Sequence, residues 1–194
     1  MNSLQGKKTA FAADDMTLVH ASKIGDIAAF GELVKRYDRR LLRIAQHVTH
    51  HYEDAQDAVQ EAFLKAFQNL SRFQENSAFS TWLIRITLNE SLMKLRKQHA
   101  KREMARDRDF RAEEDSPSPE IRDWAPNPEE RYRTSEIREI LIKTLQRLQP
   151  SLRVVFVLHD MDGLSLDETA KVLDLGQLAV KARSSRAWLK LAKD

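Results

Sequence analysis

Apolar residues recur every three or four positions along most of the chain. The first stripe consists of Phe30, Leu33, Val34, Tyr37, Leu41, Ile44, Ala45 and Val48. This spacing is typical of one face of an α-helix, which has 3.6 residues per turn. The run His50-His51-Tyr52 interrupts it, and a second stripe follows that consists of Val59, Phe63, Ala66, Phe67 and Leu70. The N-terminal half is therefore predicted to begin with consecutive amphipathic helices.

The segment from residue 79 to residue 97 has two apolar phases. The first consists of Phe79, Trp82, Leu83 and Ile86, and the second of Leu88, Leu92 and Leu95. A straight amphipathic helix keeps one phase. The change near Thr87-Leu88-Asn89 therefore predicts a break between two helices.

The C-terminal part contains shorter apolar runs. One helical stripe, which stops at Pro150, consists of Ile137, Ile140, Leu141, Leu145 and Leu148. Residues 152–158 are apolar and β-branched, which by composition could be a strand. We favour a helix, because the run lies among helices and ends before Gly163, a residue type that suits the left-handed position after a helix.

Local signals define the last two helices. Ser165 and Glu168 have the spacing of a capping box, in which each side chain accepts a hydrogen bond from the other residue's backbone N–H. The tight turn at residues 174–176 ends this helix, and the last helix is predicted from about Gln177 to Ala192. These are the proportions of a helix-turn-helix.

Composition supports an all-α fold. The chain has 194 residues, with only 5 glycines and 5 prolines, and four of the prolines lie in a polar segment between residues 117 and 128. We therefore expect an all-α protein of two small helical domains joined by a flexible, Pro-containing linker, the C-terminal domain being a helix-turn-helix. The expected boundaries are a disordered extension over residues 1–13, domains over 14–99 and 131–194, and a linker over 100–130 that is partly helical at its start.

Charge is distributed unevenly along the chain. The net charge is +3 at pH 7, and residues 98–130 hold 6 basic against 10 acidic residues between two basic flanks. The basic residues of the last helix are Lys181, Arg183, Arg186, Lys190 and Lys193, and residues 177–193 contain no acidic one. A helix that faces phosphates and base edges requires such a surface, although a solvated terminal helix has the same pattern. The helix-turn-helix signals beside it favour DNA binding.

The second predicted helix carries the opposite charge. Asp54, Asp57 and Glu61 share one face beside Gln60, opposite the apolar stripe. A solvated surface is the usual reason for such a row, and periodicity alone favours it. The functional alternative is a docking face for a basic protein surface.

Aromatic and basic residues are combined between residues 79 and 102. Phe79 and Trp82 precede a basic run that consists of Lys94, Arg96, Lys97, Lys101 and Arg102. Single-stranded nucleic acid binds to stacking surfaces next to cations that neutralise phosphates. For the two aromatic residues, a place in the core is at least as good an interpretation.

No motif points to an enzyme. The chain has no cysteine, so disulfides and thiolate metal sites are excluded. His47, His50 and His51 lack a pattern such as H-E-x-x-H, and we expect them to form a loop of exposed histidines. There is no Gly-rich phosphate loop and no G-x-S-x-G, so we expect no catalytic residue, cofactor or metal. Without a run of about 18 apolar residues or a signal-peptide core, we predict a cytoplasmic protein with no membrane insertion.

Three ordered motifs resemble those of the extracytoplasmic-function (ECF) sigma factors, the small sigma subunits of bacterial RNA polymerase. Residues 54–63 (DAQDAVQEAF) are similar to the family's core-polymerase-binding helix, and residues 79–96 to its −10-element segment. Residues 162–187 are similar to its −35-element helix-turn-helix, and residues 127–130 (NPEE) to the usual end of its linker. The resemblance covers nearly the whole chain after Asp14.

The resemblance implies roles for individual residues. Those implied to bind core polymerase are Asp54, Asp57, Gln60 and Glu61. Those implied to bind the −10 element, where a flipped base is captured, are Trp82, Asn89, Glu90, Ser91, Lys94, Arg96 and Lys97. Those implied to bind the −35 duplex are Lys181, Arg183, Ser185, Arg186 and Lys190. The implied partners are the bacterial RNA polymerase core, promoter DNA and an anti-sigma factor, often membrane-anchored in this family, that holds the protein inactive.

The expected function is therefore promoter-specific transcription initiation by a sigma factor, through −35 recognition and −10 melting. Two other classes remain open at this point. One is a helix-turn-helix regulator that acts without docking on polymerase, and the other is an interaction protein that keeps the sigma fold but has lost promoter binding.

Overall fold

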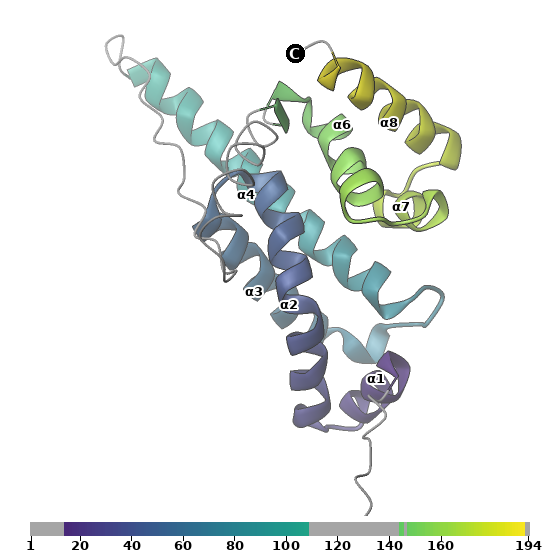
Figure 1. The fold of residues 1–194 in the computed structure, drawn as a ribbon. Helices are drawn as coiled ribbons and strands as arrows, with labels where there is room; N and C mark the ends of the chain where they lie inside the picture. Colours follow the sequence, from purple (N-terminus) through teal and green to yellow (C-terminus); the bar gives the residue numbers. More distant parts are fainter. Residues whose placement is uncertain (1–13, 109–143, 146, 193–194) are drawn as a thin grey trace, which may run out of the picture.

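The computed structural model of the chain describes residues 14–108, 144–145 and 147–192. Within these ranges every regular element is a helix and no strand is formed (Figure 1). The predicted all-α class is confirmed. The extension 1–13, most of the predicted linker and the apolar positions at 137–141 lie outside the described residues, so the domain boundaries stay predictions.

The N-terminal region, residues 14–108, is a bundle of long helices. Its elements are α1 (Asp15–Lys23), α2 (Ile27–Thr49), α3 (Tyr52–Gln68), the 3₁₀ turn η1 (Leu70–Arg72) and α4 (Phe79–Arg108). Asp26 caps α2 by accepting a hydrogen bond from the Ala29 backbone N–H at 3.1 Å. His50 ends α2 in the left-handed conformation, with φ 59°, where the sequence pattern is interrupted. The α2 face that was predicted to be apolar lies in the core.

The predicted break near Thr87-Leu88-Asn89 is wrong, because α4 is one helix of 30 residues. Two apolar phases occur because α4 is covered from two sides, by α2 and α3 and by the C-terminal helix α7. The buried hydroxyls of Thr87 and Ser91 donate to the carbonyls of Leu83 and Thr87 at 3.0 and 2.8 Å. These internal bonds satisfy the polar groups within the helix, so it continues through the phase change.

The C-terminal region, the described residues from 144 to 192, is a helix-turn-helix with a preceding helix. Its elements are α6 (Pro150–Val155), the π-helical turn η2 (Phe156–Met161), α7 (Leu166–Leu173) and α8 (Gln177–Leu191). The helical interpretation of residues 152–158 is confirmed. Gly163 has φ 74°, and the capping box of Ser165 and Glu168 is formed in both directions, with bonds of 3.2 and 2.8 Å. Asp174 makes the turn before α8 with φ 54°.

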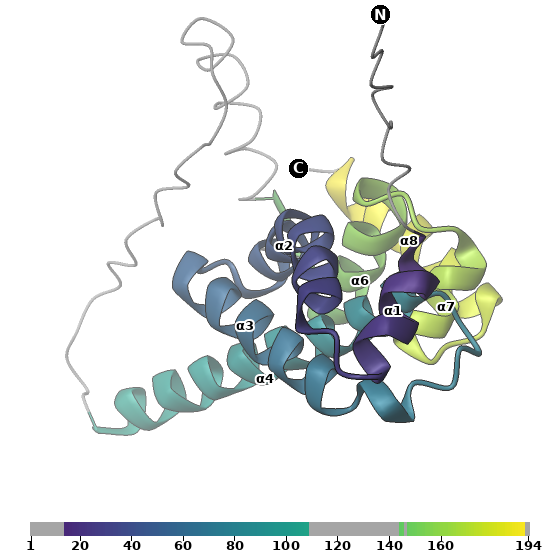
Figure 2. The ribbon, with the colours of Figure 1, turned by 90° about the horizontal axis from the view of Figure 1, so that it is seen from below.

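The two regions pack against each other. The C-terminal residues that join the buried cluster of the N-terminal region are Val154, Val157, Leu158, Leu164 and Val172. Figures 1 and 2 show the C-terminal helices lying beside α2 and α4. At the edge of this contact Arg40 Nη2 is 2.7 Å and Arg43 Nη2 is 3.3 Å from the Asp162 carboxylate, whose side chain is only 3% exposed. One nearly buried acid therefore joins two arginines of α2 to the C-terminal region.

Replacing Asp162 with asparagine should weaken the contact between the regions. The substitution keeps the volume but removes the charge that compensates two arginines. Because both arginines are partly exposed, we expect the contact between the regions to lose about 1–2 kcal/mol of stabilising free energy. Small-angle X-ray scattering should show a larger radius of gyration, and thermal unfolding a lower midpoint.

The matched control is Asp167→Asn. Asp167 pairs with Lys171 one turn away on α7, and both side chains are 54% exposed, so its loss should leave the radius unchanged. An Asp162→Asn protein with the wild-type radius would show that this carboxylate does not hold the regions together.

Candidate functional site

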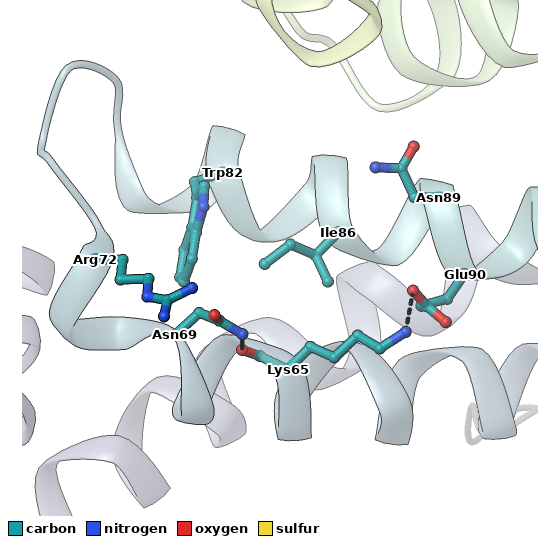
Figure 3. Close-up of a pocket in the computed structure, with 7 residues that line it drawn as sticks. All are labelled: Lys65, Asn69, Arg72, Trp82, Ile86, Asn89 and Glu90. Atoms are coloured by element: carbon teal, nitrogen blue, oxygen red, sulfur yellow. Dashed lines mark hydrogen bonds and ion pairs between the residues drawn. The ribbon is translucent and has the colours of Figure 1, made fainter.

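An open pocket of about 390 Å³ lies between the end of α3, η1 and the first half of α4 (Figure 3). We call it the α3–α4 pocket. Its lining residues are Lys65, Asn69, Arg72, Trp82, Ile86, Asn89 and Glu90. Three of them, Trp82, Asn89 and Glu90, belong to the set that the family resemblance implied for −10 binding. The pocket thus combines an aromatic side chain, an aliphatic one and five polar ones.

Trp82 is held in place by other aromatic rings. Its ring lies 5.0 Å from that of Phe73, at an interplanar angle of 32°, and 5.8 Å from that of Phe79. Phe73 and Phe79 are buried, whereas Trp82 is partly exposed toward the pocket. The two interpretations of this aromatic segment therefore apply to different residues, because Phe79 is core and Trp82 is both packed and accessible.

Lys65 and Glu90 form an ion pair in the wall of the pocket. Lys65 Nζ lies 2.7 Å from Glu90 Oε1, and the Glu90 side chain is 9% exposed. The hydrogen bond to Glu90 raises the pKa of Lys65. The second oxygen, Glu90 Oε2, is buried and has no hydrogen-bond partner among the described residues. A buried acceptor costs free energy while it is unpaired, and because this oxygen is not accessible it offers no hydrogen bond to a ligand in this structure.

The other residues of the −10 set lie in different places. Asn89 is exposed and in Figure 3 points away from the Lys65–Glu90 pair. Ser91 is fully buried, with its hydroxyl bonded to Thr87 O, so it cannot reach a base in this structure. Farther along α4, Arg96 and Lys97 are exposed, and Lys94 Nζ lies 2.7 Å from Asp57 Oδ2.

The acidic row of α3 is on the surface, as its spacing predicted, but it is partly paired. The Asp57 side chain is 61% exposed although it pairs with Lys94, and Gln60 is exposed without such a pair. Asp54 accepts a hydrogen bond from Gln98 of α4, and Glu61 lies 3.6 Å from Lys65. The implied polymerase-binding and −10 sets therefore meet along the contact between α3 and α4.

Some residues of this surface were not predicted from the sequence. Lys65, Asn69 and Arg72 line the pocket, and their i, i+4, i+7 spacing on α3 and η1 was the signal that could have found them. Phe67 was predicted on the buried face, yet it is 44% exposed. Its ring packs edge-to-face on that of Phe30, with centroids 5.0 Å apart, at the edge of the helical bundle and not in its core. Leu64 is also half exposed beside the acidic row.

The basic face of α8 is open. Val180 and Ala187, on its opposite face, are buried. The basic residues implied for −35 binding are Lys181, Arg183, Arg186 and Lys190. In the described part of the chain none of them pairs with an acidic side chain. Ser185, which lies beside them, is exposed. Arg183, Arg186 and Lys190 line a groove of about 440 Å³ next to the start of α6. Lys193 lies outside the described residues.

Asp160 fixes the orientation of α8. Its carboxylate accepts from the Trp188 indole N–H at 2.9 Å and from the Ser184 hydroxyl at 3.1 Å. Trp188 also packs edge-to-face on Phe156, with ring centroids 5.3 Å apart. These contacts hold α8 against η2, while Lys181, Arg186 and Lys190 of α8 are exposed.

The histidine prediction is partly wrong. His51 is exposed, but His47 lies within α2 and the His50 ring is partly buried near Arg153. Burial, followed by the charge of Arg153, lowers the pKa of His50 to about 3. Arg153 itself is buried and donates to the carbonyls of Leu145 and Leu148 at 2.8 Å. Among the described residues no three His, Cys, Asp or Glu side chains form a metal-binding group. No helix in the described ranges is long and apolar enough to cross a membrane.

Comparison with known proteins agrees with this geometry. The family description Sigma-70 region 2 matches residues 33–101, and Sigma-70, region 4, matches residues 138–191. The chain is 35% identical to the ECF RNA polymerase sigma-E factor of Escherichia coli (strain K12) over 173 residues, and these residues cover 89% of this chain and 90% of that protein. It is 33% identical over 181 residues to the RNA polymerase sigma-H factor of Pseudomonas aeruginosa, with 89% of each chain covered.

Solved structures give the same picture. CnrH, in complex with the cytosolic domain of CnrY, is similar with a TM-score of 0.67 and 29% identity, over 92% of this chain and 95% of that one. The sigma factor RpoE of Bartonella quintana, in complex with the anti-sigma factor NepR, shares the fold with a TM-score of 0.65 and 22% identity, over 86% of this chain and 96% of that one. With both sigma regions matched in order and close relatives aligned over nine-tenths of their length, the chain belongs to the ECF sigma factor family.

Proposed function

We propose that this protein binds the RNA polymerase core and directs transcription initiation at promoters that it recognises through a −35 and a −10 element. The observation that supports this best is the presence in one chain of two different surfaces that suit nucleic acid. One is the α3–α4 pocket, which has an aromatic wall and polar side chains. The other is the basic face of α8, whose cations pair with no acidic side chain in the part of the chain that the structure describes. Such a protein would act in the cytoplasm, where polymerase and chromosome are.

The α3–α4 pocket suits an unpaired base of the −10 element. A base that leaves the duplex loses stacking and pairing, at a cost of a few kcal/mol. Trp82 and Ile86 offer apolar surface for the ring, while the exposed amide of Asn89 offers hydrogen bonds to its edge. Arg72 at the pocket, with Arg96 and Lys97 along α4, would neutralise the neighbouring phosphates.

The face of α8 suits duplex DNA at the −35 element. Arg183 and Arg186 are the candidates for bidentate contacts to guanine, because the guanidinium presents a planar pair of donors. Lys181 and Ser185 lie at neighbouring positions of the exposed face, and Lys190 would contact phosphate. The capping box of α7 and the bonds from Asp160 fix the two helices of the motif.

The acidic row of α3 is the proposed polymerase-binding surface. Asp54, Asp57, Gln60 and Glu61 would meet a basic surface of the core enzyme. Leu64 and Phe67, both about half exposed, add apolar area beside the row. An interface of this kind joins charge complementarity to a small apolar centre.

Control by an anti-sigma factor is part of the proposal. The related fold of RpoE is known in complex with the anti-sigma factor NepR, and CnrH in complex with a cytosolic domain of CnrY. The anti-sigma factor of this chain would be membrane-anchored, as is often the case in the family. The second candidate function, a helix-turn-helix regulator without polymerase docking, is supported only by the open face of α8.

The test is transcription with the full chain and bacterial core polymerase on a set of genomic templates. We expect new transcript starts that share a sequence at fixed distances upstream. DNA binding without new starts would support the regulator instead. Polymerase binding without new starts would indicate a sigma fold that has lost promoter recognition.

Reversing the charge of Asp57 and Glu61 to lysine should weaken core binding roughly tenfold or more, about 1.4 kcal/mol. The reason is that two cations would then face the basic surface of polymerase. Affinity for core enzyme is the measurement. A control with the same change of charge on α2, Glu32→Lys with Asp38→Lys, should bind core normally, and equal affinities for the two double variants would show that the assigned face is wrong.

Asn89→Ala should reduce promoter opening several-fold, since a lost hydrogen bond to the captured base is worth about 1 kcal/mol. Binding to duplex −35 DNA should not change. Permanganate reactivity of unpaired thymines measures the opening. Ser91→Ala is the control, because its buried hydroxyl is bonded within α4 and promoter opening should not change. Arg183→Ala should instead weaken binding to duplex −35 DNA. An Asn89→Ala protein that opens the promoter like wild type, with the same −10 preference, would refute the assignment of this residue.

A further inference from the structure

The loop between η1 and α4 contains one residue in an unusual backbone conformation. Glu75 has φ 60°, a left-handed conformation that non-glycine residues rarely adopt. Two further non-glycine residues in the described ranges have positive φ, His50 and Asp174, and they end helices α2 and α7, where this conformation is common. Glu75 ends no helix, so its conformation needs another cause.

Contacts from α1 supply that cause. Lys23 Nζ lies 2.8 Å and His20 Nε2 lies 2.9 Å from the same oxygen, Glu75 Oε1. Lys23 also donates to the carbonyl of Phe73 at 2.9 Å, and its ammonium lies 5.5 Å from the centroid of the Phe73 ring. These interactions lower the pKa of Glu75, with the Lys23 hydrogen bond as the largest cause. One lysine of α1 thus binds the loop at a backbone atom, a ring and a carboxylate.

The same loop contacts residues that line the α3–α4 pocket. Phe73 is 5% exposed and is stacked on Trp82, and Arg72 precedes it directly in the sequence. Trp82 and Arg72 both line the pocket, whereas His20, Lys23 and Glu75 do not. A shift of Phe73 would therefore move both the aromatic wall and the guanidinium that stand beside a bound base.

We propose that Lys23 and His20 of α1, through Glu75, are positioning residues that set the geometry of the α3–α4 pocket and so the efficiency of −10 opening. This rests on the proposed function of that pocket. Helix α1 ends before the matched Sigma-70 region 2, which begins at residue 33, so the family match gives α1 no role. The alternative is that these contacts only stabilise the fold, as exposed ion pairs on a surface do weakly.

Substitutions at Glu75 separate the two explanations. Both Glu75→Ala and Glu75→Gly remove the carboxylate, but glycine adopts positive φ without strain. Glu75→Gly should therefore be more thermostable than Glu75→Ala. If the carboxylate positions the pocket, both variants lose promoter opening to the same extent, about five- to tenfold. If the contact is only structural, opening follows thermostability and Glu75→Gly opens better than Glu75→Ala.

The experiment uses the full chain with core polymerase and measures permanganate reactivity at the −10 element, duplex −35 affinity, core affinity and the thermal midpoint. Lys23→Ala should lose opening about as much as Glu75→Ala, with −35 and core affinities unchanged. Lys23→Arg keeps a cation and should retain most of the opening. The matched control is Lys35→Ala, a lysine of α2 that is 80% exposed and lies 3.8 Å from Glu32, and it should behave like wild type.

Trp82→Ala distinguishes failure of this proposal from failure of the pocket assignment. If Trp82→Ala loses opening while Lys23→Ala opens like wild type, the pocket binds the −10 element and the role of α1 is refuted. If Trp82→Ala itself opens like wild type, the pocket does not act in opening and both proposals fail together. Opening that follows the thermal midpoint across the Glu75 variants likewise refutes the positioning role.

Discussion

Helix α4 packs against α2 and α3 along one side and against α7 along another, and this double contact constrains the rest of the structure. A helix covered from two sides must bury more than one stripe, so polar residues such as Thr87 and Ser91 lie inside the protein. They remain there at low cost because each hydroxyl bonds a carbonyl of the same helix. The uninterrupted helix in turn fixes Trp82, Asn89 and Glu90 along one wall of the α3–α4 pocket.

The contact between the two regions combines apolar burial with a few charged bonds. Val157 and Leu158 are almost completely buried in a cluster that also contains residues of α2 and α4. Such burial is non-directional, and orientation comes from polar contacts at its edge, chiefly Asp162 with the arginines of α2. Because those arginines are partly exposed, water can replace the carboxylate at modest cost. Burial of apolar side chains thus holds the two regions together, and the charged contacts at the edge set their relative orientation.

Structural features with a local signal in the sequence were predicted correctly. The capping box at Ser165, the left-handed Gly163 and the helix ends at His50 and Asp174 depend on a few neighbouring residues, and the structure has them as predicted. Features that depend on packing against a second element were predicted wrongly. The phase change near Thr87 indicated a break because the partner on the far side of α4 is distant in sequence. The burial of His50 and the exposure of Phe67 likewise depend on tertiary contacts, with Arg153 and with Phe30.

The candidate site was predictable as residue types but not as an arrangement. The acidic row of α3 and the basic run of α4 were separate features of the sequence, yet Asp57 and Lys94 lie 2.7 Å apart, and Glu61, Lys65 and Glu90 form a chain of charges. The Asp57 side chain is 61% exposed, and a pair of this kind contributes less than about 1 kcal/mol. A basic protein surface could therefore take over Asp57 at little cost and leave Lys94 free for a phosphate. The closeness of these charges gives a physical route by which docking on a protein and binding of DNA at α4 would favour each other.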